Sequence, residues 1–457
     1  MPSLPELPIP PSWFPGHMRR FTRILPPLLH KTNVVLEVRD TRLPLTSINH
    51  QLEGALRTWR LQHGWDPADP SRRIVDTTAC ERIVVFSKRD LVPEWGLRPF
   101  QRAMANRFPG QRHVFASGQR PSDIRNLRNM LEDLAKKYPY ATEMNVLCIG
   151  MPNVGKSTLL NALRGAGIAG QTAKAFRTSG NPGLTQTLSM RVRLSRSLPI
   201  YAYDSPGVML PFLGHGPEGA ERGVRLALIA GIKEGLYDFE ALAAYLLYHL
   251  NVLNPEAPAY LSILPPGTLP VAELETFLDI LAQRMGMVGK GGVLDRSRAA
   301  VFFVRWWRGE GNLLASDSSF EAAPSSALRI ASPDASGSLL SAPNALVQPK
   351  AGSLVPGASR PRATLAPLGW GLDLEWSLTA EERQRPLSPT AMEAKMGQCI
   401  DRHLAQMAEE EASENNVSVN QRRKAVIEER KAKIAEKAKM MTKKIRRAEE
   451  RKRAARR

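Results

Sequence analysis

One segment constrains the fold of this chain more than any other. Residues 150–157, Gly-Met-Pro-Asn-Val-Gly-Lys-Ser, fit GxxxxGK[ST]; an apolar run (144–149) precedes them and an amphipathic helix pattern (158–163) follows. This order predicts a phosphate-binding loop (P-loop), whose backbone N–H groups wrap phosphate at the positive end of a helix. Lys156 would reach the β- and γ-phosphates, and the Ser157 hydroxyl would ligand Mg²⁺. The residues expected around the phosphates are Asn153, Val154, Gly155, Lys156, Ser157 and Thr158.

A second motif, Asp204-Ser205-Pro206-Gly207, follows a strand-like run at 198–203. A carboxylate at a strand end can hold the Mg²⁺ shell, and Gly207 lets its N–H approach a γ-phosphate. Between the two motifs, Pro-Gly-Leu-Thr at 182–185 predicts a turn that presents the Thr185 hydroxyl. The metal ligands predicted from the sequence are therefore Ser157, Thr185 and Asp204.

The motif expected to read the base lies upstream of the P-loop. A strand-like run at 82–86 leads into Ser87-Lys88-Arg89-Asp90, which resembles the guanine-reading motif NKxD. The Asp90 carboxylate would accept hydrogen bonds from guanine N1 and N2, and adenine offers no such pair of donors. A further strand, 113–117, would place a small loop over the base. The candidate base-contacting residues are Ser87, Lys88, Asp90, Ala116 and Ser117.

The order of these motifs is permuted. In the ordinary GTPase order the base-reading motif comes last, whereas here it comes first. Because a sheet is closed in space and not by strand order, the same doubly wound core can be built from a permuted chain. We therefore predict an α/β fold in which residues 13–210 form a circularly permuted P-loop GTPase domain with a mostly parallel sheet.

Together these motifs resemble the YlqF-type circularly permuted GTPases, and in particular their mitochondrial, ribosome-associated members. Trp-Phe-Pro-Gly-His-Met at 13–18 and Glu-Val-Arg-Asp-Thr-Arg-Leu-Pro at 37–44 also carry the resemblance, which runs from about residue 13 to 313. It implies a GTP hydrolase with a slow intrinsic rate that the ribosome stimulates. It further implies a role in assembly of the large ribosomal subunit in the mitochondrial matrix, with nucleotide state coupled to ribosomal RNA binding. A monomer and peripheral association with the matrix face of the inner membrane are also implied.

The resemblance assigns further residue roles. The family usually has Asn where this chain has Ser87, and a serine is too short to contact both base and P-loop. This predicts reduced nucleotide affinity, with guanine selectivity kept by Asp90. Val208 stands where Ras-like GTPases have a water-orienting Gln, which makes His17 the candidate catalytic residue; helix capping is its alternative role. An Asn at position 153 helps related GTPases to bind K⁺, and the alternative is a simple turn residue.

The rest of the chain divides by composition. Residues 1–12 are Pro-rich and predict disorder, and residues 211–313 predict a helical domain that meets ribosomal RNA in the family. Residues 314–370 are rich in Ser, Ala and Pro and predict a disordered linker. Residues 371–457 predict a helical, basic C-terminal extension, with a helix of mixed charge over 378–412.

The net charge of +19 is concentrated at the end of the chain. Residues 421–457 contain 17 Lys and Arg against 5 Glu, so +12 of the +19 lies there. This excess favours an RNA phosphate partner; the alternative is a solvated helix with i,i+4 ion pairs. Cys80, Cys148 and Cys399 have no CxxC spacing and predict reduced, structural thiols.

Other classes of function and another location stay open. One is a non-catalytic, nucleotide-dependent RNA-binding scaffold; another is a P-loop small-molecule kinase, against which the guanine-reading motif argues. A cytosolic or nucleolar ribosome-assembly GTPase is the alternative location. Residues 1–12 contain Glu6 and no arginine, unlike an Arg-rich presequence. Either the true start lies upstream, or basic residues of the first predicted helix double as a targeting signal. Those residues are Arg19, Arg20, Arg23 and Lys31.

Overall fold

The computed structural model describes residues 3–11, 13–69, 71–76, 78–139, 141–168, 176, 185–311, 367–383 and 387–412. Within them, one six-stranded sheet has the order β3-β2-β1-β4-β6-β5. Neighbouring strands from β3 to β6 are parallel, and β5 is antiparallel to β6, which confirms the predicted mostly parallel sheet. The strands are β1 (Val34–Asp40), β2 (Glu81–Ser87), β3 (Arg112–Ala116), β4 (Met144–Gly150), β5 (Val192–Arg193) and β6 (Ile200–Asp204).

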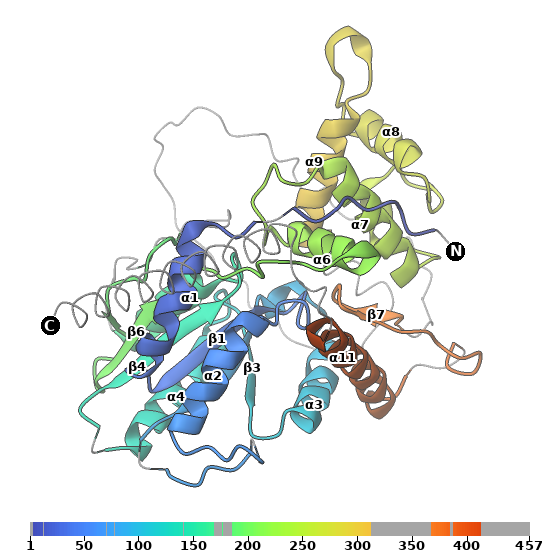
Figure 1. Cartoon of the computed structure of the whole chain (residues 1–457). Helices are drawn as coiled ribbons and strands as arrows, with labels where there is room; N and C mark the ends of the chain where they lie inside the picture. The colour runs from blue at the N-terminus through green and yellow to red at the C-terminus, as the bar shows by residue number, and fades with distance from the viewer. Residues whose placement is uncertain are drawn as a thin grey trace, which may run out of the picture.

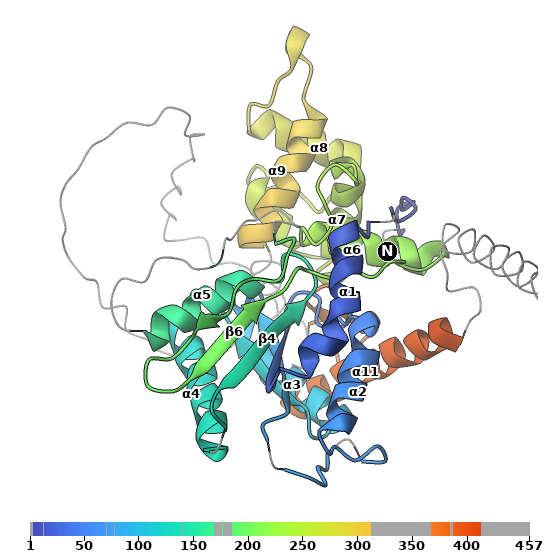
Figure 2. The same ribbon diagram turned by 60° about the vertical axis from the view of Figure 1, so that its left-hand side comes forward.

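Helices cover both faces of this sheet (Figures 1 and 2). One face, which includes Leu36, Val146 and Ala202, packs against α4 (Pro121–Lys137) and α5 (Lys156–Gly167). The opposite face packs against three other helices. These are α1 (Gly16–Leu29), α2 (His50–Gln62) and α3 (Leu97–Arg107). Burial of parallel strands on both faces explains why their sequences are nearly continuous apolar runs.

The permuted chain order brings the predicted motifs to one edge of the sheet. The P-loop follows β4, the base-reading motif begins at the end of β2, and Asp204 ends β6. Because these strands are parallel, their carboxyl ends meet at the same edge. In doubly wound sheets this edge is where ligands bind.

A helical domain follows β6. Its elements are α6 (Gly216–Leu228), α7 (Phe239–Leu253), a 3₁₀ turn (Ala259–Ile263), α8 (Leu274–Arg284), a second 3₁₀ turn (Lys290–Gly292), α9 (Arg296–Trp306) and a π-helical turn (Trp307–Gly311). Phe277, Phe303 and Trp307 are buried at its centre. Its apolar core is continuous with that of the sheet through Met209 and Leu213. The domain therefore packs directly on the chain that leaves the Asp204 motif (Figure 1).

The N-terminal segment lies against the start of the helical domain. Residues 3–11, for which the sequence predicted disorder, contain no helix or strand and line a pocket together with residues 212–220. Leu7 is partly buried and packs against the main core.

The chain returns to the GTPase domain after residues 312–366, which lie outside the described part and contain most of the predicted linker. A hairpin of β7 (Gly369–Trp370) and β8 (Leu374–Glu375) shares an apolar core with α3. The Trp370 ring lies 5.3 Å from the Phe100 ring, centroid to centroid. The boundary predicted at residue 370 therefore falls inside this hairpin.

The last described helix, α11 (Pro389–Ala412), packs along α3 and begins later than predicted. The sequence pattern predicted helix over 378–412, but the Ser388 hydroxyl accepts a hydrogen bond from Ala391 N at 3.1 Å. Serine before the first turn and proline at its first position are typical of a helix start. Residues 413–457, with the predicted basic tail, lie outside the described residues.

The three cysteines are buried free thiols. Burial raises the pKa of Cys80 to about 11, and it raises the pKa of Cys148 well above its usual range. Both thiols therefore stay protonated at neutral pH. None of the described helices is long and apolar enough to span a membrane.

Candidate nucleotide-binding site

The P-loop joins β4 to α5 through three residues with left-handed backbone. The φ angle is 146° at Gly150, 57° at Asn153 and 89° at Gly155. A Cβ on Gly150 would lie 2.2 Å from a carbonyl oxygen of β1, so only glycine fits there. Lys156 begins α5 and is 6% exposed; its Nζ donates to the carbonyl oxygens of Gly150 (3.3 Å) and Met151 (2.8 Å). The lysine amine therefore lies within the turn where phosphates would bind.

The Ser157 hydroxyl and the Asp204 carboxylate meet beside this turn. Ser157 Oγ donates to Asp204 Oδ2 at 2.5 Å, and Asp204 Oδ1 is buried without a partner among the described residues. Burial raises the pKa of Asp204, and nearby Lys156 opposes the rise. A buried oxygen without a partner is costly unless a ligand satisfies it. Because carboxylate and hydroxyl oxygens suit Mg²⁺, the two side chains fit a magnesium ion.

Thr185, the third predicted Mg²⁺ ligand, is half-buried at the start of a segment that leads to β5. Further along this segment, Ser189 N donates to Asp204 O (2.9 Å), and Asp204 N donates to Ser189 Oγ (2.7 Å). The preceding residues of the predicted turn, 182–184, lie outside the described residues. The described residues contain no group of three His, Cys, Asp or Glu side chains placed to hold a metal. Magnesium would therefore also depend on nucleotide phosphates for its ligands.

The loop after β6 packs on the P-loop. A Cβ on Gly207 would lie 2.5 Å from the Cα of Pro152, so a side chain has no room there. Val208 N donates to Gly150 O (3.1 Å), and Val208 O accepts a hydrogen bond from Asn49 Nδ2 (2.7 Å). Movement of the Gly207 loop would therefore disturb contacts with the P-loop backbone.

Ser87, at the end of β2, also contacts the P-loop. Its Oγ lies 2.6 Å from the carbonyl oxygen of Val154 and 3.0 Å from that of Arg39. A hydroxyl carries one hydrogen, so a bond to either oxygen leaves no donor for a base. The shorter distance is to the P-loop, which makes Ser87 a link between the base-reading motif and the phosphate site.

Lys88 and Asp90 follow Ser87 in the base-reading motif. Lys88 has a left-handed φ of 57°, and its Nζ donates to Asn153 O in the P-loop (2.6 Å) and to Asp40 Oδ2 (3.0 Å). Burial lowers the pKa of Lys88, and Asp40 opposes this effect. Asp90 Oδ1 is buried without a partner among the described residues. A buried carboxylate oxygen that lacks a hydrogen-bond partner is suited to accept a hydrogen bond from an N–H group of guanine.

The loop after β3 lies beside the start of α5. Ala116 is paired with Ser87 in the parallel register, and the next residue, Ser117, is buried. A Cβ on Gly118 would lie 3.1 Å from Thr158 Cγ2, so this loop closely approaches the helix of the P-loop. The sequence did not single out Gly118, because only the fold brings it beside Thr158.

A buried ion-pair group supports Lys88, and the sequence motifs did not reveal its role. The carboxylate of Asp40 accepts hydrogen bonds from Arg42 Nε (2.9 Å) and Nη2 (2.8 Å) as well as from Lys88. Burial alone would raise the pKa of Asp40, but the charges of Arg42 and Lys88 hold it well below its usual range. Thr41 N donates to Ser87 O (3.0 Å). This segment therefore positions the base-reading motif.

His17 lies in the first turn of α1. Its Nε2 is buried without a partner among the described residues, and burial lowers its pKa, which favours the neutral imidazole at pH 7. The adjacent Met18 accepts a hydrogen bond at Sδ from Met209 N (3.4 Å). Because Met209 is two residues from Gly207, the start of α1 is held close to the loop after β6.

The P-loop and the ion-pair group both contact the helical domain. Asn153 Nδ2 donates to the carbonyl oxygen of Ile229, the residue after α6 (3.2 Å). Arg308 donates to two carbonyl oxygens at the end of α6 (2.7 and 3.0 Å), and its own carbonyl oxygen lies 3.5 Å from Arg42 Nη1. One end of α6 is thus tied to the candidate site at two points.

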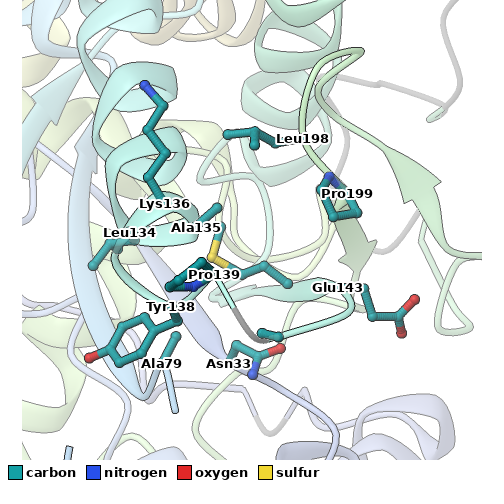
Figure 3. A pocket seen from close by; sticks show the side chains of 12 residues that line it. Asn33, Ala79, Leu134, Ala135, Lys136, Tyr138, Pro139, Glu143, Leu198 and Pro199 are labelled. Atoms are coloured by element: carbon teal, nitrogen blue, oxygen red, sulfur yellow. The ribbon is translucent and has the colours of Figure 1, made fainter. Parts of the chain in front are cut away.

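A separate pocket lies at the opposite, amino edge of the sheet (Figure 3). Its volume is about 340 Å³, and Leu134, Tyr138 and Pro199 contribute to its mostly apolar lining. None of the residues predicted to contact nucleotide lines it. It is therefore distinct from the candidate nucleotide-binding site.

Comparisons with known proteins find similar GTPases. A family model described as "50S ribosome-binding GTPase" matches residues 145–240. The chain is 30% identical over 305 residues to Mitochondrial GTPase 1 of Schizosaccharomyces japonicus, covering 65% of this chain and 87% of that protein. It is 27% identical over 284 residues to Mitochondrial ribosome-associated GTPase 1 of Xenopus tropicalis, covering 61% and 81%. A solved structure, GNP-bound YlqF from T. maritima, is similar at 19% identity and a TM-score of 0.39, covering 65% of this chain and 96% of that chain.

The first of these relatives is matched over most of its length. This match confirms the resemblance that the permuted motif order indicated. The chain belongs to the mitochondrial GTPase 1 family of circularly permuted GTPases.

Proposed function

We propose that this protein is a GTP-hydrolysing switch in the assembly of the mitochondrial large ribosomal subunit, with its nucleotide state coupled to ribosomal RNA binding. The observation that carries the proposal is the meeting of four motifs at the carboxyl edge of one sheet. They are the P-loop, the Asp204 loop, and the loops that follow β2 and β3.

In this proposal the guanine of GTP or GDP binds between the loops after β2 and β3, and Asp90 reads its N1 and N2. Ser87, Lys88, Ala116 and Ser117 form the rest of the base site. The phosphates lie against residues 153–158, and Gly207 N–H faces the γ-phosphate. Mg²⁺, held by Ser157, Thr185 and Asp204, would neutralise phosphate charge. The buried Asp204 Oδ1 supports this metal site.

Asn153 is the proposed ligand for an assisting K⁺. Its amide nitrogen donates to Ile229 O, so the amide oxygen is the atom that would face the cation. This arrangement allows one side chain to contact both the helical domain and the phosphate site.

We assign His17 the role of orienting or deprotonating the attacking water. Val208 is fully buried and has no side-chain atom that can form a hydrogen bond, so it cannot take this role. The unpartnered Nε2 of His17 and the contact between Met18 and Met209 support the assignment. A neutral imidazole can accept a proton from water.

Coupling between nucleotide and RNA is proposed to pass through α6. Loss of the γ-phosphate would release Gly207, whose loop packs on the P-loop and leads into the helical domain. The bonds from Asn153 and Arg308 to the end of α6 support this route. Such coupling of a switch loop to a domain interface is a known mode of GTPase regulation.

The partner and location follow from relatives. Their names place them in mitochondria and, for the Xenopus tropicalis protein, on the ribosome. We propose that this protein acts in the matrix and that residues 211–313 face ribosomal RNA. A monomeric state and peripheral contact with the inner membrane stay predictions from the resemblance.

Co-sedimentation with purified mitochondrial large subunits tests the proposed function. We expect more protein in the subunit fraction with a non-hydrolysable GTP analogue than with GDP, because γ-phosphate contacts hold the switch loops. ATP analogues are the matched control and should have no effect. Equal binding in the GTP, GDP and ATP forms would contradict a nucleotide-controlled switch.

Asp90→Asn is expected to exchange base selectivity. Xanthine presents a carbonyl where guanine has its amino group, so an amide at position 90 suits xanthine better. Affinity for GTP should fall by about 10- to 100-fold, the range for a lost hydrogen bond to a charged group. A competition assay between GTP and xanthosine triphosphate measures the change. As a companion variant, Ser87→Asn should tighten GDP binding or leave it unchanged. Unaltered GTP preference in Asp90→Asn would refute the base assignment.

Deletion of residues 421–457 is expected to weaken subunit binding and to flatten its dependence on salt. Each phosphate contact that is lost removes about 0.7 to 0.9 from the slope of log affinity against log salt. Titrations with and without the segment at several KCl concentrations measure this slope. GTP hydrolysis in the absence of subunits serves as the control and should hardly change. Equal slopes would identify the segment as a solvated helix.

A further inference from the structure

Helix α1 carries a basic face that has no role in the nucleotide site. We define this basic face by three exposed arginines, Arg19, Arg20 and Arg23; a fourth exposed cation, Lys31, lies two residues beyond the end of the helix. The helix sequence contains no Asp or Glu, and none of the four side chains forms an ion pair with another described residue. Some other exposed arginines are paired, as Arg296 is with Glu275 and Asp279, whereas others, such as Arg98 and Arg102 of α3, form no ion pair with described residues. A concentration of unpaired cations of this kind suits a polyanionic partner.

The geometry of the helix separates this face from the core. Met18, Phe21, Leu25 and Leu29 are buried on the other side of α1. At 100° and 1.5 Å per residue, the three arginines share an arc of about 100°, and the rise from position 19 to position 23 is about 6 Å. An arginine guanidinium group can donate two hydrogen bonds to one phosphate group, so the face suits a phosphate backbone.

The buried side of α1 argues against a membrane as the main partner. An interfacial helix must place its apolar side in the lipid. Here Phe21, Leu25 and Leu29 already pack against Leu147 and Ile149 of β4. Figure 2 shows α1 alongside β4. Of the large apolar side chains of α1, Ile24 alone is exposed (40%), so the exposed side fits a phosphate backbone better than insertion into a bilayer.

We propose that the basic face of α1 docks on the phosphate backbone of ribosomal RNA in the large subunit and thereby positions His17 for GTP hydrolysis. This inference rests on the proposed function and adds the surface through which the ribosome stimulates the enzyme. It makes Arg19, Arg20 and Arg23 positioning residues, since they act through the helix that carries His17.

The packing of α1 supplies the mechanical link. Its buried side shares a core with Val208, and Met18 accepts the hydrogen bond from Met209 N. Phosphates held on the exposed side would therefore restrain the helix against the loop that follows Gly207. Restraint of the first turn places the His17 imidazole and lowers the entropy cost of aligning it with the attacking water.

The test compares two triple variants with equal loss of charge. One is Arg19→Gln, Arg20→Gln, Arg23→Gln. The matched control is Arg98→Gln, Arg102→Gln, Arg125→Gln, which changes exposed arginines of α3 and α4 that form no ion pair with other described residues. Each variant is titrated with purified large mitochondrial subunits, with protein-free RNA from those subunits, and with cardiolipin vesicles. Stimulated GTP hydrolysis is expressed relative to the same variant's rate without subunits.

The α1 variant is expected to bind subunits and free RNA at least about tenfold more weakly, with a salt slope reduced by about 2 to 3. Its stimulation should fall by at least about tenfold, and an Arg→Lys triple variant at the same positions should restore most RNA binding. Salt slopes like those of the control would overturn the inference. Weaker binding to vesicles alone would also overturn the inference. Weaker binding to intact subunits with unchanged binding to free RNA would overturn it too. Failure of the unmodified protein to bind subunits would instead refute the proposed function, and the free-RNA titration would still decide the role of the basic face.

Discussion

Lys156→Ala is expected to lower affinity for GTP and GDP by about 10²- to 10³-fold, or about 3–4 kcal/mol, which lies within the range for an uncompensated buried charge. Lys156 is 6% exposed at the start of α5, where its amine lies inside the P-loop turn. Burial lowers its pKa, and Asp204 opposes this effect. Without the amine, bound phosphates would face Asp204 with less positive charge to offset the repulsion.

Equilibrium titration with a fluorescent GDP analogue measures this effect. Lys136→Ala, on the exposed side of α4, is the control and should bind as the unmodified protein does. Thermal unfolding of both variants checks that the fold is intact. Affinity of Lys156→Ala within threefold of the control value would contradict the phosphate assignment.

His17→Ala is expected to lower the subunit-stimulated rate of GTP hydrolysis by about 10²-fold or more, within the range for a positioned acid–base group. GTP affinity should stay near that of the unmodified protein, because His17 is assigned to the water and not to the nucleotide. Single-turnover phosphate release with saturating subunits measures the rate. His30→Ala is the matched control, since His30 is exposed at the other end of the same helix.

The pH dependence gives a second readout for His17. Burial lowers its pKa below the usual value of about 6.5, and the neutral imidazole is the active form. The stimulated rate should therefore be level above pH 6.5 and fall as the pH decreases through the lowered pKa. His17→Ala should lack this acid limb. Full stimulation of the variant would point to a group supplied by RNA, or to K⁺ at Asn153.

The main features of the fold could be predicted because they are local. The P-loop is bounded by a strand and a helix, and Asp204 ends a strand-like run, so sequence spacing alone indicated which loops would share an edge. The alternation of parallel strands and helices then predicted a doubly wound sheet. The family resemblance pointed to His17, and the structure adds that Met18 anchors its helix beside Met209.

The parts that sequence did not predict depend on contacts between distant residues. Asp373 accepts hydrogen bonds from Leu45 N and Thr46 N, both at 2.8 Å, which holds the β7–β8 hairpin on the GTPase domain. Composition of the segment before this hairpin gave no sign of such a contact. The contacts of Asp40 with Lys88 and Arg42 could not be predicted for the same reason. Lys88 is distant from the other two residues in the sequence, and only the pairing of their strands brings the three side chains together.

The proposed switch requires that the large ribosomal subunit stimulates GTP hydrolysis by this protein. Phosphate release from GTP, measured with and without purified mitochondrial large subunits, tests it most directly, with small subunits as the control. We expect slow release by the protein alone and a rate at least about tenfold higher with large subunits, as when a catalytic group is positioned by its partner. GTP hydrolysis that is undetectable with large subunits, or equal with and without them, would contradict the account and favour a non-catalytic scaffold.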